Sequence, residues 1–208
     1  MDAAYPDGFF DRADPSDDAR FYEQPRLLTH IDDAAIAAVG ALYAHLGLGG
    51  TTVLDLMSSW VSHFHPDSEP KELTVLGMNA DELAANPLAT RAVVRDINVE
   101  PTLPFDDASF DHATCCVSVD YLTQPVAVFR EVARVLRPGG WFVVTFSNRL
   151  FPTKAIRGWR NTDSVGHCRI VESYFANAGG FDEPTAQLRT PITQPGDPLF
   201  GVFARRAL

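Results

Sequence analysis

Short apolar runs recur along the chain and have the pattern of buried β-strands. Both alternating faces of these runs are hydrophobic and rich in β-branched residues, as in strands that are covered on both sides of a sheet. Stretches with helical spacing separate most of the runs, and this alternation is typical of a parallel sheet. The predicted strands cover residues 52–56, 73–78, 92–97, 113–117, 141–146, 185–189 and 199–205.

Three segments carry the clearest helical pattern. Apolar residues recur at helical spacing over residues 32–45, and Asp32 or Asp33 supplies the start signal. Residues 125–136 begin with a proline, which suits a first helical turn, and a Pro-Gly-Gly sequence ends them. Residues 164–178 form the third helix and end at a pair of glycines. Helices of this length between the strands predict an α/β fold.

The domain organisation follows from the absence of internal boundaries. No repeat, low-complexity tract or linker divides the 208 residues, so we expect one domain over residues 1–208. Within it, residues 1–46 are predicted to form an N-terminal arm and a lid helix, and residues 50–208 the core. An apolar share of 46%, with 14 Phe and 3 Trp, is sufficient for a sizeable core.

Charge and cysteine content restrict the partners. A formal net charge of −10 disfavours nucleic acid and anionic lipid surfaces, because both require a basic face. Three cysteines imply no disulfide framework, no apolar run approaches the roughly 18 residues of a membrane span, and the acidic N-terminus does not resemble a signal peptide. We therefore expect a cytoplasmic protein whose partner is a small molecule. The sequence predicts no oligomeric state.

Two sequence blocks carry a family resemblance. Residues 103–111 read LPFDDASFD before the fourth predicted strand, and residues 131–140 read EVARVLRPGG before the fifth. This pair of blocks resembles class I methyltransferases (type 11-like) that use S-adenosylmethionine, and the resemblance covers roughly residues 50–148. It implies a Rossmann-like three-layer sandwich with a mostly parallel seven-stranded sheet, its last strand antiparallel. It also implies methyl transfer from S-adenosylmethionine to a small-molecule acceptor.

The loop after the first strand departs from the family pattern. Similar enzymes have an acid at the strand end and then a glycine-rich loop under the methionine part of the cofactor. Asp55 supplies the acid, as a cofactor contact or a loop-bracing carboxylate, but Met57, Ser58 and Ser59 replace the glycines. We expect a changed loop conformation, serine groups that donate hydrogen bonds to the cofactor, and only a short helix before the second strand, since prolines interrupt it.

The next two strands end at the positions that hold the adenosine part in similar enzymes. Asn79 stands where the family has an acid for the ribose hydroxyls, and it can also cap a helix starting near residue 80. Asp96 and Ile97 match the adenine-binding position, with Asn98 as the second candidate.

Further candidates follow the fourth and fifth strands or lie in the arm. The resemblance implies that Val117 and Ser118 lie beside the sulfonium. Asp120 and Tyr121 are the catalytic candidates, because Asp120 could orient the acceptor or remove its proton, although an ion pair or a helix cap explains it equally well. The candidates for acceptor binding are Tyr22, Arg26, His30, Asn148 and Arg149, of which the first three could instead contact the cofactor carboxylate.

Other chemistries find little support in the sequence. His63 and His65 lack metal-ligand spacing and acidic company, and Cys115 and Cys116 point to opposite faces of a strand, so no metal site is predicted. No G-x-G-x-x-G follows the first strand, which argues against a nicotinamide-dependent oxidoreductase. The missing glycines leave one alternative, a methyltransferase fold that binds a ligand without transferring a methyl group.

Overall fold

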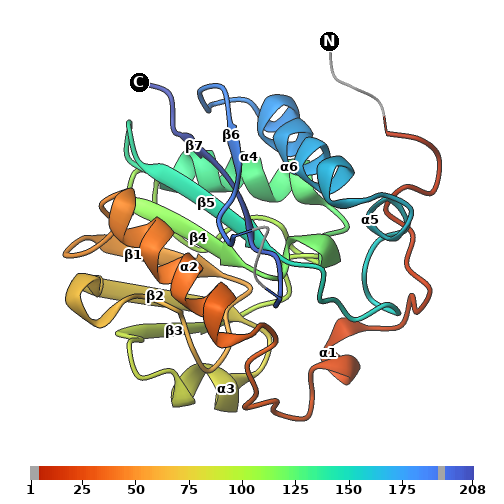
Figure 1. The fold of residues 1–208 in the computed structure, drawn as a ribbon, viewed down its shortest axis with the longest axis horizontal. Helices are drawn as coiled ribbons and strands as arrows, with labels where there is room; N and C mark the ends of the chain where they lie inside the picture. The colour runs from red at the N-terminus through yellow and green to blue at the C-terminus, as the bar shows by residue number, and fades with distance from the viewer. Residues whose placement is uncertain (1–4, 192–194) are drawn as a thin grey trace.

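Seven strands form one mixed sheet in the order β3-β2-β1-β4-β5-β7-β6 (Figure 1). The computed structural model describes residues 5–191 and 195–208. Strands β1 to β5 are mutually parallel, and β7 runs antiparallel to both of its neighbours, as predicted. The strands are β1 (Thr52–Leu56), β2 (Glu72–Gly77), β3 (Arg91–Val94), β4 (His112–Cys116), β5 (Trp141–Phe146), β6 (Thr185–Leu188) and β7 (Phe200–Arg205).

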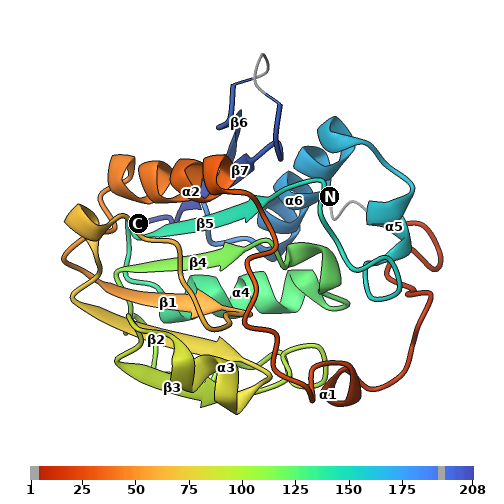
Figure 2. The same ribbon diagram turned by 60° about the horizontal axis from the view of Figure 1, so that its bottom comes forward.

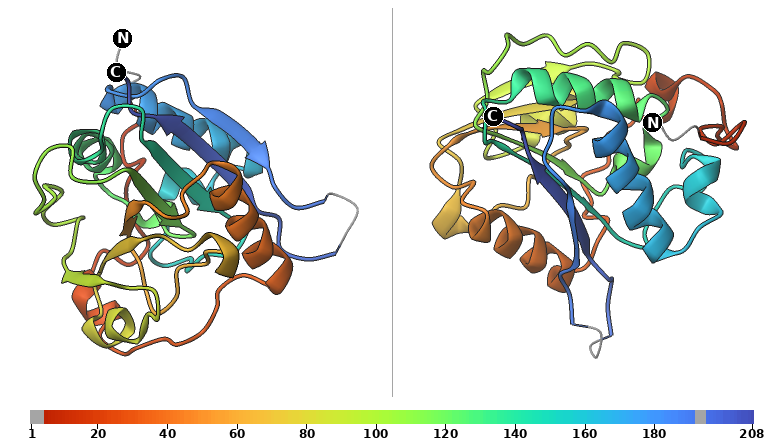
Figure 3. Two further views of the ribbon diagram at one scale, coloured as in Figure 1. Left: turned by 90° about the vertical axis from the view of Figure 1, so that its left-hand side faces the viewer. Right: turned by 90° about the horizontal axis from the view of Figure 1, so that it is seen from above.

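Helices cover both faces of this sheet, which gives the three-layer arrangement of a Rossmann-like fold. Figure 3 shows the sheet between α2 on one side and α4 and α6 on the other. The helices are α1 (Asp18–Phe21), α2 (Asp33–His45), α3 (Ala80–Ala85), α4 (Pro125–Val135), α5 (Arg157–Arg160) and α6 (Ser164–Ala178).

Alternating side chains along each strand pack into two hydrophobic cores, one on each face of the sheet. Leu54 of β1 and Val144 of β5 belong to the core beneath α4 and α6, whereas the adjacent residues Val53 and Val143 belong to the core beneath α2. Neighbouring residues of a strand point to opposite faces, so continuous apolar strands are what a sheet covered on both sides needs. Pairing of Val53 with both Leu73 and His112 sets β1 in the middle of the parallel part.

Most element boundaries agree with the sequence predictions, and the exceptions lie near the carboxyl edge of the sheet. Asp32 caps α2 by accepting the backbone N–H of Ala35, and α6 has the predicted bounds. The third strand ends at Val94 rather than at residue 97, because its pairing with β2 ends there. The short helix expected after β1 is wrong: residues 57–71 contain only a single 3-10 turn, η1 (Pro66–Ser68).

The N-terminal arm crosses the carboxyl ends of the parallel strands before it enters α2 (Figure 2). Buried ion pairs hold its first half, since Asp18 pairs with Arg12 at 2.6 Å and with Lys154 at 3.1 Å. At its other end, the backbone N–H of Asp32 donates to the carboxylate of Asp197, and the backbone N–H of Asp197 donates back to that of Asp32. The arm is therefore fastened to the core on both sides of residues 21–30. Residues 1–4 of the predicted arm lie outside the described residues.

The order of the strands places a crevice where the arm crosses. The chain passes from β1 outward to β2 and β3 and then returns to β4 on the other side of β1. In open α/β sheets, such a reversal leaves a ligand crevice at the carboxyl ends of the strands. None of the helices within residues 5–191 and 195–208 combines the length and apolar character needed to cross a membrane.

Candidate functional site

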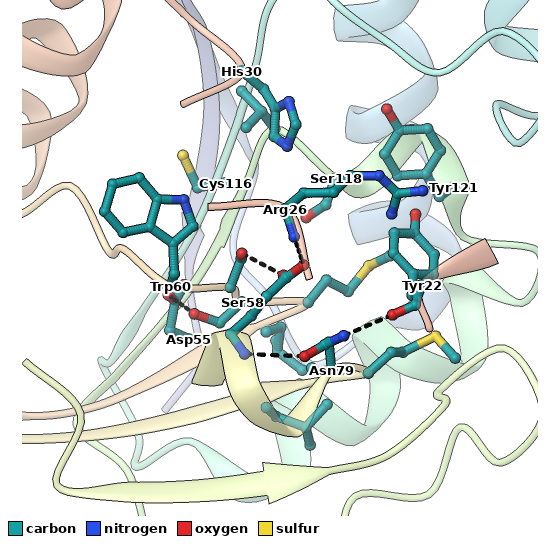
Figure 4. A pocket seen from close by; sticks show the side chains of 18 of the residues that line it. Tyr22, Arg26, His30, Asp55, Ser58, Trp60, Asn79, Cys116, Ser118 and Tyr121 are labelled. Atoms are coloured by element: carbon teal, nitrogen blue, oxygen red, sulfur yellow. Dashed lines mark hydrogen bonds between the residues drawn. The ribbon is translucent and has the colours of Figure 1, made fainter. Parts of the chain in front are cut away.

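One cavity occupies this crevice between the strand ends and the N-terminal arm (Figure 4). It brings together fourteen of the seventeen residues that the sequence marks as site candidates. Those that line it are Tyr22, Arg26, His30, Asp55, Met57, Ser58, Ser59, Asn79, Asp96, Ile97, Asn98, Val117, Ser118 and Tyr121.

Asp55, the last acid of β1, is buried beneath the cavity. Its carboxylate accepts three hydroxyl hydrogen bonds of 2.6 Å, from Ser58, Ser62 and Thr114. Burial raises the pKa of Asp55, and the three donors act in the opposite direction. These bonds tie the loop after β1 to strand β4, so the carboxylate braces the loop whatever it also does for a ligand.

The two serines of the loop both give their hydroxyl protons to protein carboxylates. Ser58 donates to Asp55, and Ser59 donates to Glu82 at 2.6 Å. A hydroxyl that donates its one proton keeps its lone pairs as acceptors. Toward a ligand, these hydroxyls therefore act as acceptors, whereas the sequence had suggested serine donors.

Glu82 is a cavity residue that sequence reasoning missed. It lies in the first turn of α3 and is buried, and it links the arm to the loop after β1. One carboxylate oxygen accepts the backbone N–H of Arg26 at 2.7 Å, and the other accepts the hydroxyl of Ser59. An acid in a first helical turn is common, because it interacts favourably with the helix dipole, so nothing in the sequence singles Glu82 out.

Asn79 caps α3 as predicted, and its other end is engaged by the arm. Its Oδ1 accepts the backbone N–H groups of Asp81 and Glu82, both at 3.0 Å. Its Nδ2 donates to the backbone carbonyls of Tyr22 at 2.9 Å and Glu23 at 3.2 Å. The whole side chain is therefore used within the protein when the arm lies in this position.

The three candidates in the segment after β3 all line the cavity, but the fold uses their side chains to different extents. Asn98 donates to Asp18 and to the carbonyl of Tyr121, and it accepts the N–H of Thr123, so its amide joins three segments of the chain. Asp96 uses only Oδ1, which accepts the N–H of Asn98 at 2.8 Å; its Oδ2 has no hydrogen-bond partner among the described residues. Ile97 is buried and presents an apolar side chain at the same place.

Two cavity residues have left-handed backbone conformations without being glycine. Met57 has a φ of 53° directly after β1, and Val117 has a φ of 46° directly after β4. Met57 thus has a backbone conformation that glycine favours, at a position where the family pattern has glycine and this sequence does not. Such a conformation is a genuine outlier for a β-branched residue, and backbone strain of this kind clusters at ligand sites.

The structure separates the two catalytic candidates. Tyr121 lines the cavity, and its hydroxyl accepts the backbone N–H of Phe151 at 2.9 Å. Asp120 is buried but does not line the cavity, and its Oδ2 has no hydrogen-bond partner within the described part of the chain. Burial raises the pKa of Asp120 to about 8. A catalytic role for either residue stays a prediction.

The two candidates after β5 lie outside the cavity. Arg149 is exposed and forms an ion pair with Asp197 at 2.7 Å, next to the end of the arm. Asn148 accepts the hydroxyl of Ser147 at 3.2 Å. Their predicted contact with an acceptor is not tested by this geometry, since the cavity wall on this side is formed by Phe151 instead.

Aromatic side chains close the cavity on the arm side. The ring of Phe151 contacts those of His30 and Tyr121, with centroid distances of 5.2 and 5.8 Å. Trp60 closes the opposite side, and its indole N–H donates to the carbonyl of Leu28 at 3.1 Å. Trp60 and Phe151 were not site candidates by sequence, because single aromatic residues in loops usually pack without a ligand.

Comparisons with known proteins find a methyltransferase domain in the first two thirds of the chain. A family model described as a methyltransferase domain matches residues 45–144. The biotin biosynthesis bifunctional protein BioHC of Teredinibacter turnerae is 35% identical over 68 residues, which are 32% of this chain and 12% of that protein. The ubiquinone biosynthesis O-methyltransferase of Paracidovorax citrulli is 29% identical over 105 residues, which are 50% of this chain and 42% of that protein. The matched segments thus span less than half of either curated relative.

A solved structure shows the same fold over most of the chain. Geranyl diphosphate C-methyltransferase from Streptomyces coelicolor A3(2) superimposes with a TM-score of 0.61 and covers 91% of this chain and 97% of its own, at 13% sequence identity. That enzyme was solved with Mg²⁺, geranyl diphosphate and S-adenosyl-L-homocysteine. At this level of identity the likeness concerns the fold.

Proposed function

We propose that the chain is a class I methyltransferase and that it transfers the methyl group of S-adenosylmethionine to a small-molecule acceptor. The observation that carries the proposal is the convergence of fourteen predicted site residues on one cavity at the carboxyl ends of the parallel strands. Four separate loops and the arm contribute them, so their convergence is a property of the fold and not of one local segment.

The donor set of the cavity fits the proposed cofactor. The open oxygen of Asp96 can accept the adenine amino group, and Ile97 offers an apolar surface for the ring. The oxygens of Ser58 and Ser59 can accept from the amino group of the methionine part. When bound, S-adenosylmethionine supplies an electrophilic methyl group on a positively charged sulfur.

One contact requires a rearrangement within the protein. Asn79 can meet the ribose only if its Nδ2 leaves the carbonyls of Tyr22 and Glu23. At the other end of the cofactor, no α-helix follows β1 within residues 57–71, so no helix N-terminus balances the cofactor carboxylate. A group from the arm would have to supply the positive charge. Binding in this chain is therefore coupled to the position of the arm.

The contribution of the protein to the reaction is mainly positioning. Val117 and Ser118 lie at the end of β4, and Tyr121 and Phe151 form the adjacent wall, so an acceptor held there would face the centre of the cavity. The arm lies over the site and contributes Tyr22, Arg26 and His30 to its lining. Holding two reactants in line supplies a large part of the barrier reduction without a group that moves a proton.

Calorimetry with S-adenosylmethionine and S-adenosylhomocysteine tests the proposal. We expect both to bind, and Asp96→Ala to weaken binding by about 1–3 kcal/mol, the typical effect of removing one partner of a buried hydrogen bond. Asp106→Ala, at an exposed carboxylate far along the same loop, serves as the control.

Absence of binding at millimolar cofactor would overturn the proposal. Binding without methyl transfer to any member of a broad metabolite panel would favour the alternative, a methyltransferase fold that retains a ligand but has lost the reaction. Normal binding by Asp96→Ala would move the adenine contact elsewhere.

A further inference from the structure

Arg26 presents a guanidinium group to the cavity, and none of the residues that the structure describes pairs a carboxylate with it. Its Nη2 donates to the carbonyl of Phe21 at 2.7 Å, but its Nη1 is buried and has no hydrogen-bond partner among the described residues. The guanidinium carbon lies 4.5 Å from the ring centroid of Phe21 and 5.5 Å from that of Phe151. A buried N–H group of a cation that is left unsatisfied is costly, and native proteins normally pair it.

The neighbouring charged side chains are already engaged within the protein, either by ion pairs or by hydrogen bonds from neutral donors. Asp18 pairs with Arg12 and Lys154, and Arg95 pairs with Glu100 at 2.6 Å. Glu82 receives the backbone N–H of Arg26 and the hydroxyl of Ser59, so it holds the arm in place and contacts no guanidinium nitrogen. Among the described residues Arg26 thus forms no ion pair, and its Nη1 is the donor that a ligand could use.

The direction of the side chain separates the two ligands that could supply an anion. In Figure 4 the guanidinium points toward Tyr121 and Tyr22, away from Asp55, Ser58 and Trp60. The methionine end of the cofactor belongs to the loop of Ser58, whereas Tyr121 and Phe151 belong to the predicted acceptor wall. Arg26 therefore serves the acceptor side of the cavity.

We propose that Arg26 binds a carboxylate of the acceptor, and that the acceptor is a small aromatic acid. The assignment of this carboxylate to an acceptor rests on the proposed function. The presence of an anion site at Arg26 does not depend on it. Arginine pairs with carboxylates through two parallel N–H bonds, which gives both strength and orientation. The adjoining rings of Tyr121, Phe151 and His30, which meet edge to face and at a tilt, provide an aromatic wall against which the ring of such a molecule can pack.

Matched pairs of an acid and its amide test the proposal. Benzoate, phenylacetate, benzamide and phenylacetamide are titrated into the full chain by ligand-observed NMR, with and without saturating S-adenosylhomocysteine. We expect at least one acid to bind at least tenfold more tightly than its amide. Arg26→Gln, which keeps the backbone N–H to Glu82, should abolish the difference, and Arg26→Lys should retain part of it. Arg20→Gln removes the same charge from an exposed position of the same arm and should change nothing.

The outcomes separate this inference from the proposed function. The proposed carboxylate site is wrong if acids and amides bind equally, or if neither acid binds at millimolar concentration. If Arg26→Gln weakens S-adenosylhomocysteine as strongly as the acids, the guanidinium holds the cofactor carboxylate and the inference is wrong. Failure of S-adenosylhomocysteine to bind the unmodified chain removes the proposed function, while the titrations without it still decide whether Arg26 binds a carboxylate. Circular dichroism of each variant confirms that it is folded.

Discussion

The side-chain amide of Asn79 donates a 2.9 Å hydrogen bond to the backbone carbonyl of Tyr22. A second bond from the same nitrogen reaches the carbonyl of Glu23. Through this one amide, the N-terminal arm contacts the end of β2 at the position where the proposed cofactor would place its ribose. The position of the arm and the binding of a ligand are therefore linked.

Replacing Asn79 with Asp tests this link. The carboxylate still accepts the N–H groups of Asp81 and Glu82, but it sets an acceptor against the carbonyls of Tyr22 and Glu23. We expect a loss of about 1–3 kcal/mol in the stability of the closed arm. Hydrogen exchange should rise in residues 21–30 and stay unchanged in the sheet. Asn161→Asp, at an exposed position, provides the control. Unchanged exchange in the arm would show that the amide contributes nothing to its closure.

Asp120→Asn should change the pH dependence of stability. Burial raises the pKa of Asp120 to about 8, well above the ordinary value of 3.8, so the folded state binds this proton more tightly than the unfolded state. Stability from this group is fully present below pH 4 and falls as the pH rises toward 8, by about 1.4 kcal/mol per unit. The variant should be several kcal/mol more stable than the unmodified protein at pH 8 and nearly equal to it at pH 4.

Urea unfolding at intervals between pH 4 and pH 8.5 measures this effect. Asp106→Asn, at an exposed carboxylate, should leave the slope of stability against pH as it is. If Asp120→Asn shows the same slope as the unmodified protein, the carboxyl group titrates normally in the fold.

Val117 allows the backbone strain next to the cavity to be measured. Val117→Ala and Val117→Gly remove nearly the same packing, so their difference reports on the backbone. At a φ of 46°, the Val117→Gly variant should be more stable to unfolding than Val117→Ala by about 1 kcal/mol. The reason is that a left-handed conformation costs an L-residue about 1–2 kcal/mol. The same pair at Val126, inside α4, should give the opposite order. Alanine more stable than glycine at both positions would contradict the strain.

Lys154→Met should release the first half of the arm. The ammonium group is fully buried and contacts the carbonyl of Ser16 and the carboxylates of Asp14 and Asp18. Breaking a buried ion pair by removing one partner costs about 3–5 kcal/mol, because the other charge is left uncompensated. We expect faster proteolysis within residues 11–20 and a lower unfolding temperature. Lys71→Met, on the surface, is the control, and equal resistance of both variants would show that the arm is held by other contacts.

The fold could be predicted because its signals are local and repeated. Apolar strands on both alternating faces, such as residues 141–146, can be stable only under two layers of helices, and Asp32 and Asn79 cap helices where their types suggest. The end of β3 could not be predicted, because it depends on where the backbone pairing with β2 ends, at Gly77 and Val94. The cavity lies at the predicted place, since strand ends in this order converge on one edge, and the roles of its residues stay predictions.

The chemistry of the site was less accessible to sequence reasoning. The direction of a hydroxyl depends on which carboxylate lies nearby, so nothing in residues 57–60 shows that Ser58 and Ser59 donate to protein groups. Glu82 looks like an ordinary acid of a first helical turn, and only the fold brings it against the arm. Asp120 lies in a 3-10 turn between the lining residues Ser118 and Tyr121, and its own side chain does not line the cavity.

The two fastenings of the arm have a kinetic consequence. Because Asp18 and Asp32 are tied to the core, we expect opening of the cavity to displace only residues 21–30 and to leave both ends in place. Lid segments of enzymes move on timescales of about microseconds to milliseconds. Departure of the arm has to break the bonds from Asn79 and Glu82, so we expect it to be slower than its return. Exchange of ligands is thus governed by how often the arm leaves, and a variant that weakens these bonds should speed the escape of product before it alters the chemistry of the site.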